Sequence, residues 1–231
     1  MKNQKLPAYL RLLEALFLGV AISVIALNAP HIFPITETSL PWMRASITHT
    51  FMWILSVLIA LILTKGKLRD YGFTKGKFRL TGKIFLWAIP MAILSVMGFI
   101  ASRSGTEVKE VSGLSQLQAI IFVWIYASIC EEIFTRGLLQ SFLAPLTRYG
   151  FNLSKKLRLS LPVLFSGLYF GMMHIVAINK IGPSVIVFAS LLGIIAGYYR
   201  EKTESLIPAI IIHALFNIGG MLPMWLLSRL F

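Results

Sequence analysis

Long apolar stretches separated by short polar segments make up most of this chain. A helix that crosses the hydrocarbon core of a bilayer needs about 20 mostly apolar residues. Stretches close to or above that length lie at 9–29, 45–64, 84–102, 115–145, 160–179, 184–199 and 206–228. A break at Pro223 in the last stretch would add a short eighth segment. The pattern therefore predicts an all-α fold, a multi-pass integral membrane helical bundle with seven to eight transmembrane helices.

One transmembrane domain is expected over residues 1–231. The stretch 115–145, at about 1.5 Å per residue, is longer than a bilayer is thick, so we expect it to tilt or to project from the membrane. The first apolar run resembles a signal peptide, but no clear small-residue cleavage site follows it. We therefore expect it to be a retained first helix.

Composition and charge support a membrane protein and argue against binding of nucleic acid. Hydrophobic residues make up 57% of the chain and charged residues 13%, with a mean hydropathy of +0.78. The net charge is +13, but 16 of the 22 basic residues lie before or at the start of the first helix, with Arg11 the last of these, or in segments 65–83, 146–158 and 200–205. These segments share one side of the predicted topology, so the bias follows the positive-inside rule. We expect a cell-membrane protein with a cytoplasmic N-terminus, whose loop 65–83 touches anionic lipid headgroups.

A small set of polar residues lies within the apolar stretches, where an ionisable side chain costs several kcal/mol unless it is paired or hydrated. Most acidic residues of the chain fall in loops, whereas the residues of this polar set lie deep in three predicted helices. The set consists of Glu131, Glu132, Arg136, His174, His213 and Asn217. The histidines His31 and His49 lie near the first loop, and we assign them no role. The single cysteine, Cys130, has no neighbour in the sequence that would activate it.

Helical spacing predicts which of these residues share a face. Glu132 and Arg136 are four residues apart and can form an ion pair within their helix. Glu131 is rotated about 100° away and faces Thr135, so it lacks a cation on its own helix.

His213 and Asn217 are also four residues apart, as are Phe170 and His174. Three helices could therefore bring one carboxylate, two imidazoles and one carboxamide together. Gly-x-x-x-Gly occurs at 167–171 and at 193–197, a spacing that lets helices approach closely.

Such a set of groups is typical of hydrolysis. A glutamate held in a dry environment can take a proton from water, and a histidine can orient that water. A second histidine and an amide can donate hydrogen bonds to the oxyanion of a tetrahedral intermediate. The same ligand types could hold a divalent metal such as zinc, with Glu131, His174 and His213 as the candidate ligands. A metal-free glutamate mechanism is equally compatible with the sequence.

Three motifs in order resemble those of the CPBP family of intramembrane proteases, which includes the type II CAAX prenyl endopeptidases and the Abi bacteriocin-immunity proteins. They are E-E-x-x-x-R at 131–136, F-x-x-x-H at 170–174 and H-x-x-x-N at 213–217. The resemblance covers roughly residues 115–220, which would form the catalytic core. It implies an intramembrane endopeptidase, with or without a metal, that acts on a membrane-anchored peptide or protein such as a prenylated CAAX-type substrate.

The resemblance also implies a role for each matching residue. Glu131 corresponds to the glutamate that activates water, and His174 to the histidine that helps to position that water. His213 and Asn217 correspond to the pair that forms the oxyanion hole. Glu132 and Arg136 correspond to supporting positions.

Two other classes of function compete with this interpretation. A proton-coupled membrane transporter also places Glu, Arg and His at mid-membrane depth, but it usually has two repeated halves, and the sequence shows no such duplication. A non-catalytic immunity or scaffold protein would have little use for a complete Glu–His–His–Asn set that is costly to bury.

Overall fold

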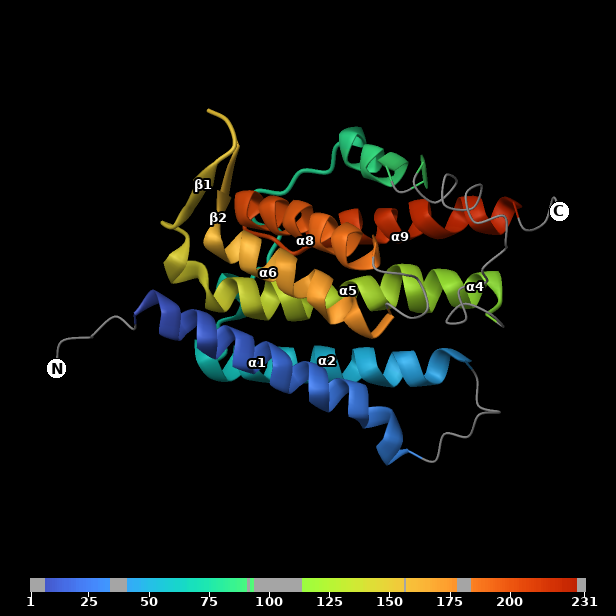
Figure 1. Cartoon of the computed structure of the whole chain (residues 1–231), viewed down its shortest axis with the longest axis horizontal. Helices are drawn as coiled ribbons and strands as arrows, with labels where there is room; N and C mark the ends of the chain where they lie inside the picture. Colours follow the sequence, from blue (N-terminus) through green and yellow to red (C-terminus); the bar gives the residue numbers. More distant parts are fainter. Residues whose placement is uncertain are drawn as a thin grey trace.

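The computed structural model describes residues 7–33, 41–90, 92–93, 114–155, 157–177 and 184–227. Within these residues the long helices lie roughly side by side, and a two-stranded antiparallel sheet lies at one end of the bundle (Figure 1). The bundle therefore has one long direction, as a set of membrane-crossing helices requires.

The helical elements differ in their winding. The α-helices are α1 (Ala8–Asn28), α2 (Pro41–Thr64), α4 (Gln116–Gln118), α5 (Ser128–Glu132), α6 (Leu161–Met173), α8 (Ser184–Thr203) and α9 (Ile207–Leu227). The 3₁₀ segments are η1 (Ala29–Ile32), η2 (Leu68–Tyr71), η3 (Gly82–Trp87), η6 (Ala144–Leu146) and η7 (His174–Ala177). The π-helical segments are η4 (Ala119–Ala127) and η5 (Ile133–Gln140), and the strands are β1 (Gly150–Asn152) and β2 (Arg158–Ser160).

Three helices in the described residues are long and apolar enough to cross a membrane. They cover Ala8–Ile32, Trp42–Thr64 and Gln116–Gln140, and shorter apolar helices cover Leu161–Met173 and Ile207–Gly220. These helices fit a helical membrane protein. The expected total of seven to eight spans stays a prediction, because the third predicted stretch, 84–102, lies mostly outside the described residues.

The observed helices depart from the predicted ones in three places. The long stretch forms one helical run, but two of its parts are wound as the π-helices η4 and η5, which apolar periodicity does not distinguish from an α-helix. α9 continues without a break through Pro223 to Leu227, so the expected break there is wrong. Strands β1 (150–152) and β2 (158–160) pair in a segment that we expected to be mostly loop.

Local sequence explains where two of the site-bearing helices begin. Ser115 caps α4 with a full capping box, in which its hydroxyl accepts from the Gln118 amide and the Gln118 side chain accepts from the Ser115 amide. Ser160 caps α6 with its hydroxyl alone, which accepts from the Val163 amide, and Pro162 lies in the first turn, where its missing N–H costs nothing.

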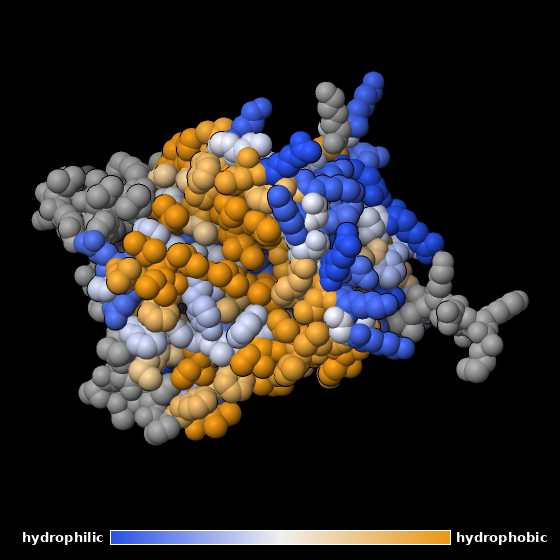
Figure 2. All heavy atoms as spheres, turned by 180° about the vertical axis from the view of Figure 1, so that it is seen from behind, coloured by the Kyte–Doolittle hydropathy of each residue, from blue (hydrophilic) through white to orange (hydrophobic). Residues whose placement is uncertain are grey.

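The basic segments come together at one end of the bundle. Arg200 at the end of α8 donates hydrogen bonds to the carbonyl of Asp70 (3.2 Å) and to the hydroxyl of Ser141 (2.7 Å). The Leu206 amide, just before α9, bonds to the Gly72 carbonyl at 3.0 Å. Figure 2 shows hydrophilic residues at this end, on the right of the view, and hydrophobic residues over the middle of the molecule. Segments 65–83 and 200–205, which we expected on one side of the membrane, are therefore neighbours in space.

Small residues bring α6 and α8 into close contact. A Cβ atom added at Gly193 would lie 2.7 Å from the Cα of Gly167 and 2.7 Å from Nη2 of Arg136. A Cβ added at Gly167 would lie 2.7 Å from the backbone nitrogen of Ile194. The two Gly-x-x-x-Gly motifs thus face each other, and the space they leave also admits the Arg136 guanidinium.

We predict that Gly193→Ala destabilises the protein. The added methyl group meets backbone atoms of α6, which cannot move aside as a flexible side chain can, so a cost of about 1–3 kcal/mol is expected. Thermal unfolding of purified protein in lipid would measure it. Gly82→Ala is the matched control, because a Cβ at Gly82 meets nothing within 4 Å. Equal melting temperatures for the two variants would contradict the close α6–α8 contact.

Candidate functional site

The helical run from α4 to η5 carries the central polar residues. Figure 1 shows α5 between α1 and α2 on one side and α6, α8 and α9 on the other. Contacts join α5 to α2 and to α9, and join η5 to α2 and to α6. Side chains on α5 can therefore meet groups from both halves of the chain.

The predicted ion pair within the helix is present and completely buried. Nη1 of Arg136 donates to Oε1 of Glu132 at 3.1 Å and also to the hydroxyl of Thr135, and the Arg136 and Glu132 side chains have no exposed area. The guanidinium also lies over the Phe170 ring, 4.6 Å from its centroid. A buried ion pair needs further partners of this kind because the desolvation of two charges is expensive.

His213 of α9 joins this buried pair to Glu131. Its Nδ1 lies 2.9 Å from Oε1 of Glu132, and its Nε2 lies 3.6 Å from Oε2 of Glu131. A carboxylate only accepts hydrogen bonds, so Nδ1 of His213 carries the proton that it shares with Glu132. Nε2 therefore faces Glu131, and Glu132 sets the orientation and the tautomer of the ring.

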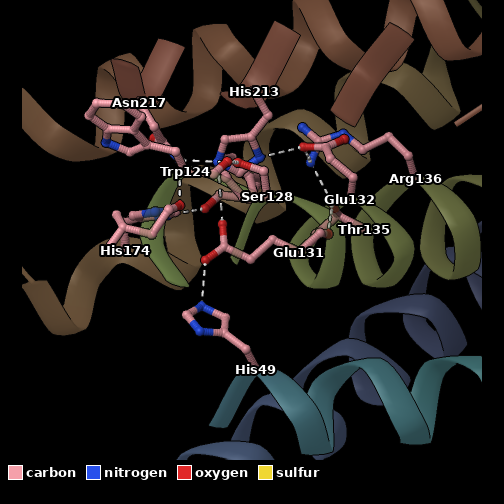
Figure 3. Close-up of polar contacts among 12 residues, drawn as sticks. His49, Trp124, Ser128, Glu131, Glu132, Thr135, Arg136, His174, His213 and Asn217 are labelled. Atoms are coloured by element: carbon pink, nitrogen blue, oxygen red, sulfur yellow. Dashed lines mark hydrogen bonds and ion pairs between the residues drawn. The ribbon is translucent and has the colours of Figure 1, made fainter. Parts of the chain in front are cut away.

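Glu131 is the carboxylate that remains partly accessible. Its side chain is 14% exposed, whereas that of Glu132 has no exposed area. Oε1 of Glu131 accepts a hydrogen bond of 2.9 Å from Nε2 of His49, which lies on α2 (Figure 3). The expected contact with Thr135 is wrong in detail, because the Thr135 hydroxyl bonds to the backbone carbonyl of Glu131 (2.6 Å) and not to its carboxylate.

His174 lies where α6 changes to 3₁₀ winding, and Figure 3 shows it to the left of the Glu131 carboxylate, with His49 below. Its Nδ1 donates to the Phe170 carbonyl at 2.8 Å, and the two rings meet edge to face with centroids 4.8 Å apart. The predicted common face of Phe170 and His174 is confirmed. The bond at Nδ1 leaves Nε2 as the nitrogen that can accept a hydrogen bond from water.

Asn217 is one turn beyond His213 on α9, but its amide is held by the central helical run. Nδ2 donates to the Val123 carbonyl at 3.3 Å and to the Ser128 hydroxyl at 3.2 Å. The Ser128 hydroxyl in turn donates to the Trp124 carbonyl at 2.8 Å. In this arrangement Asn217 connects two helices, and its N–H groups would have to change partners to bind an oxyanion.

His49 is the site residue that the sequence analysis missed. We placed it beside the first loop, whereas the structure places it in α2 against Glu131. The signal was present, since His49 lies inside the apolar stretch 45–64 and is an ionisable residue at membrane depth, as His174 and His213 are. The contact itself joins positions 82 residues apart, which no spacing rule predicts.

The candidate metal ligands do not form a ligand set. Among the described residues, no group of three or more His, Cys, Asp and Glu side chains is arranged to hold a metal ion. As they are arranged, Glu131, His174 and His213 therefore do not fit a metal centre.

Comparison with known families confirms the resemblance carried by the motifs. Residues 113–219 match the family model described as type II CAAX prenyl endopeptidase Rce1-like. The matched segment includes the three motifs and ends two residues beyond Asn217, whereas His49 lies outside it. The family is one of proteases, which supports an enzyme. No curated protein and no solved structure gives a significant match.

We predict that Arg136→Met strongly destabilises the protein. It removes the cation from a carboxylate without exposed area, and breaking a buried pair in this way costs about 3–5 kcal/mol. Lys77→Met is the control, because it breaks an ion pair with Glu204 whose two side chains are 71% and 59% exposed. Thermal unfolding should show a large drop for Arg136→Met and almost none for Lys77→Met. Similar melting temperatures for both variants would mean that the buried pair does not stabilise the fold.

Proposed function

We propose that this protein is an intramembrane endopeptidase that hydrolyses a peptide bond of a membrane-associated substrate through water activated by Glu131. The observation that carries the proposal is the environment of Glu131. It is a partly accessible carboxylate beside a fully buried one, with imidazoles from α2 and α9 facing its two oxygens. The match of residues 113–219 to a CAAX protease family supports the same chemistry.

In this mechanism Glu131 acts first as the base. A water molecule near Oε2 of Glu131 and Nε2 of His174 gives a proton to the carboxylate, and its oxygen attacks the carbonyl carbon of the substrate. A carbon–oxygen bond forms as the carbonyl electrons move to the oxygen. The proton then passes from Glu131 to the peptide nitrogen as the carbon–nitrogen bond breaks. The products are a carboxylic acid and an amine, and Glu131 is again ionised.

Asn217 and His213 are the proposed partners of the oxyanion, and His213 would donate through a second proton on Nε2, in addition to the one on Nδ1 that it shares with Glu132. The hydrogen bonds of Asn217 measure 3.2 and 3.3 Å, at the long end of the usual range, so exchange of one for a stronger bond to a developing negative charge is favourable. Catalytic hydrogen bonds commonly tighten only when substrate is bound. Glu132 and Arg136 hold His213 in place and do not themselves touch the substrate.

The proposed topology places the basic end of the bundle in the cytoplasm. Segment 65–83, whose lysines and arginines are exposed, lies at that end beside the start of α9. His213 follows the first residue of α9 by six positions, which corresponds to a depth of about 9 Å. We propose seven spans in one domain over residues 1–231, with a catalytic core near 115–220, because α9 has no break at Pro223 that would add an eighth. The substrate would be a membrane-anchored peptide that reaches the site from the cytoplasmic side, with prenylated CAAX-type sequences as the first to test.

We predict that Glu131→Gln abolishes cleavage of membrane-anchored fluorogenic peptides by purified protein in lipid. Loss of the base should reduce kcat at least about 100-fold, with an unchanged melting temperature. Glu14→Gln is the matched control, because Glu14 is an exposed glutamate on α1. Equal cleavage by the wild type and Glu131→Gln would contradict the mechanism. A loss of substrate or proton flux in place of hydrolysis would favour the transporter.

Chelation gives a separate prediction. Because the candidate ligands do not converge, we expect a strong chelator to leave the cleavage rate of the wild type unchanged. The assay is the same peptide cleavage, measured before and after dialysis against the chelator. A rate that falls and is restored by added zinc would show that cleavage depends on a metal and would contradict this prediction.

A further inference from the structure

The contact between His49 and Glu131 joins the matched family segment to the part of the chain that precedes it. His49 lies on α2, more than 60 positions before the segment begins at residue 113. Nevertheless its Nε2 is 2.9 Å from Oε1 of Glu131, closer than any other histidine nitrogen that the structure records for this carboxylate. The family match alone therefore does not include every group that touches the proposed base.

Two further contacts hold α2 beside the central helical run. The rings of Trp42 and Phe122 stack with centroids 4.5 Å apart and planes within 5°. The hydroxyls of Thr50 and Tyr126 share a hydrogen bond. These pairs join α2 to η4, which continues directly into α5 with Glu131, so the position of His49 is set by packing and does not depend on this one hydrogen bond.

The contact has a defined direction. The Glu131 carboxylate can only accept, so Nε2 of His49 donates its hydrogen to Oε1. The His49 side chain is 18% exposed, and a hydrogen bond to a charged group with little access to water is stronger than one in solvent. With Oε1 held from α2, the second oxygen, Oε2, is directed towards His213 on α9. The two imidazoles lie on opposite sides of the carboxylate (Figure 3).

We propose that His49 is a positioning residue for Glu131, which holds Oε1 of the carboxylate so that Oε2 faces the reacting water. This inference rests on the proposed function, because it assigns His49 a role in presenting the base. His49 touches neither substrate nor water in the reaction and acts only through Glu131. A glutamate has three rotatable side-chain bonds, so without this donor the carboxylate would turn among several rotamers and would present Oε2 only part of the time.

The kinetic test compares three histidine variants in the peptide cleavage assay. His49→Ala should lower kcat by about 10- to 100-fold with little change in KM, because a misplaced base slows the chemical step and leaves substrate binding intact. His49→Gln keeps an N–H donor at a similar reach and should recover most of the lost kcat. His31→Ala is the matched control, since His31 is exposed and lies outside the site, and it should behave as the wild type.

Each kinetic outcome separates the two hypotheses. If Glu131→Gln is inactive but His49→Ala cleaves like the wild type, the positioning role is wrong and the proposed function stands. If His49→Ala and His49→Gln lose kcat equally with unchanged melting temperatures, donation of a hydrogen bond is not the role of His49, and the proposal is overturned. Recovery in His49→Gln supports it.

A spectroscopic test does not depend on activity. The chain has four histidines, so the imidazole nitrogen signals of protein labelled with ¹⁵N-histidine can be assigned by single substitutions. In the wild type, Nε2 of His49 should have the shift of a protonated, hydrogen-bonded nitrogen. Glu131→Gln should move this signal and leave that of His31 in place. An unmoved His49 signal would overturn the proposal even if no substrate is cleaved, and a moved signal would support the contact if the proposed function fails.

Discussion

The buried ion pair between Glu132 and Arg136 is the constraint around which the rest of the bundle is arranged. Two opposite charges lie on one helix without any exposed side-chain area, and water cannot stabilise either of them. Within the described residues, Nε and Nη2 of Arg136 and Oε2 of Glu132 lack a hydrogen-bond partner. The neighbouring helices must therefore supply other stabilisation, because an incompletely compensated buried pair is costly.

Three neighbouring helices provide that stabilisation. α6 places the Phe170 ring against the guanidinium, and α9 places Nδ1 of His213 against Glu132. α8 contributes a glycine at position 193, where any side chain would meet Nη2 of Arg136. His174 lies at the end of α6, and His213 and Asn217 lie on α9. α8 carries no proposed catalytic group but packs against both of these helices. The ion pair thus connects the packing of the bundle to the geometry of the site.

The two adjacent glutamates have different roles because they point in different directions. Glu132 faces the buried interior and orients His213, whereas Glu131 lies about 100° around the helix and keeps limited access to its surroundings. A base needs a partner that holds it without occupying both oxygens. His49 faces Oε1 of Glu131 at 2.9 Å, and His213 faces Oε2 at 3.6 Å. Oε1 is therefore hydrogen bonded, and Oε2 remains free to take a proton.

The sequence by itself determined the class of the fold, the Glu132–Arg136 pair and the three motifs, because these depend on hydrophobic length and on neighbours within one helix. It did not predict the π-helical winding of η4 and η5, since both windings have the same apolar character. It also did not predict that His49 reaches Glu131, or that Asn217 bonds to Val123 and Ser128. Only the tertiary structure decided these contacts. They join residues far apart in the chain, and their partners depend on how whole helices pack, which no local spacing encodes.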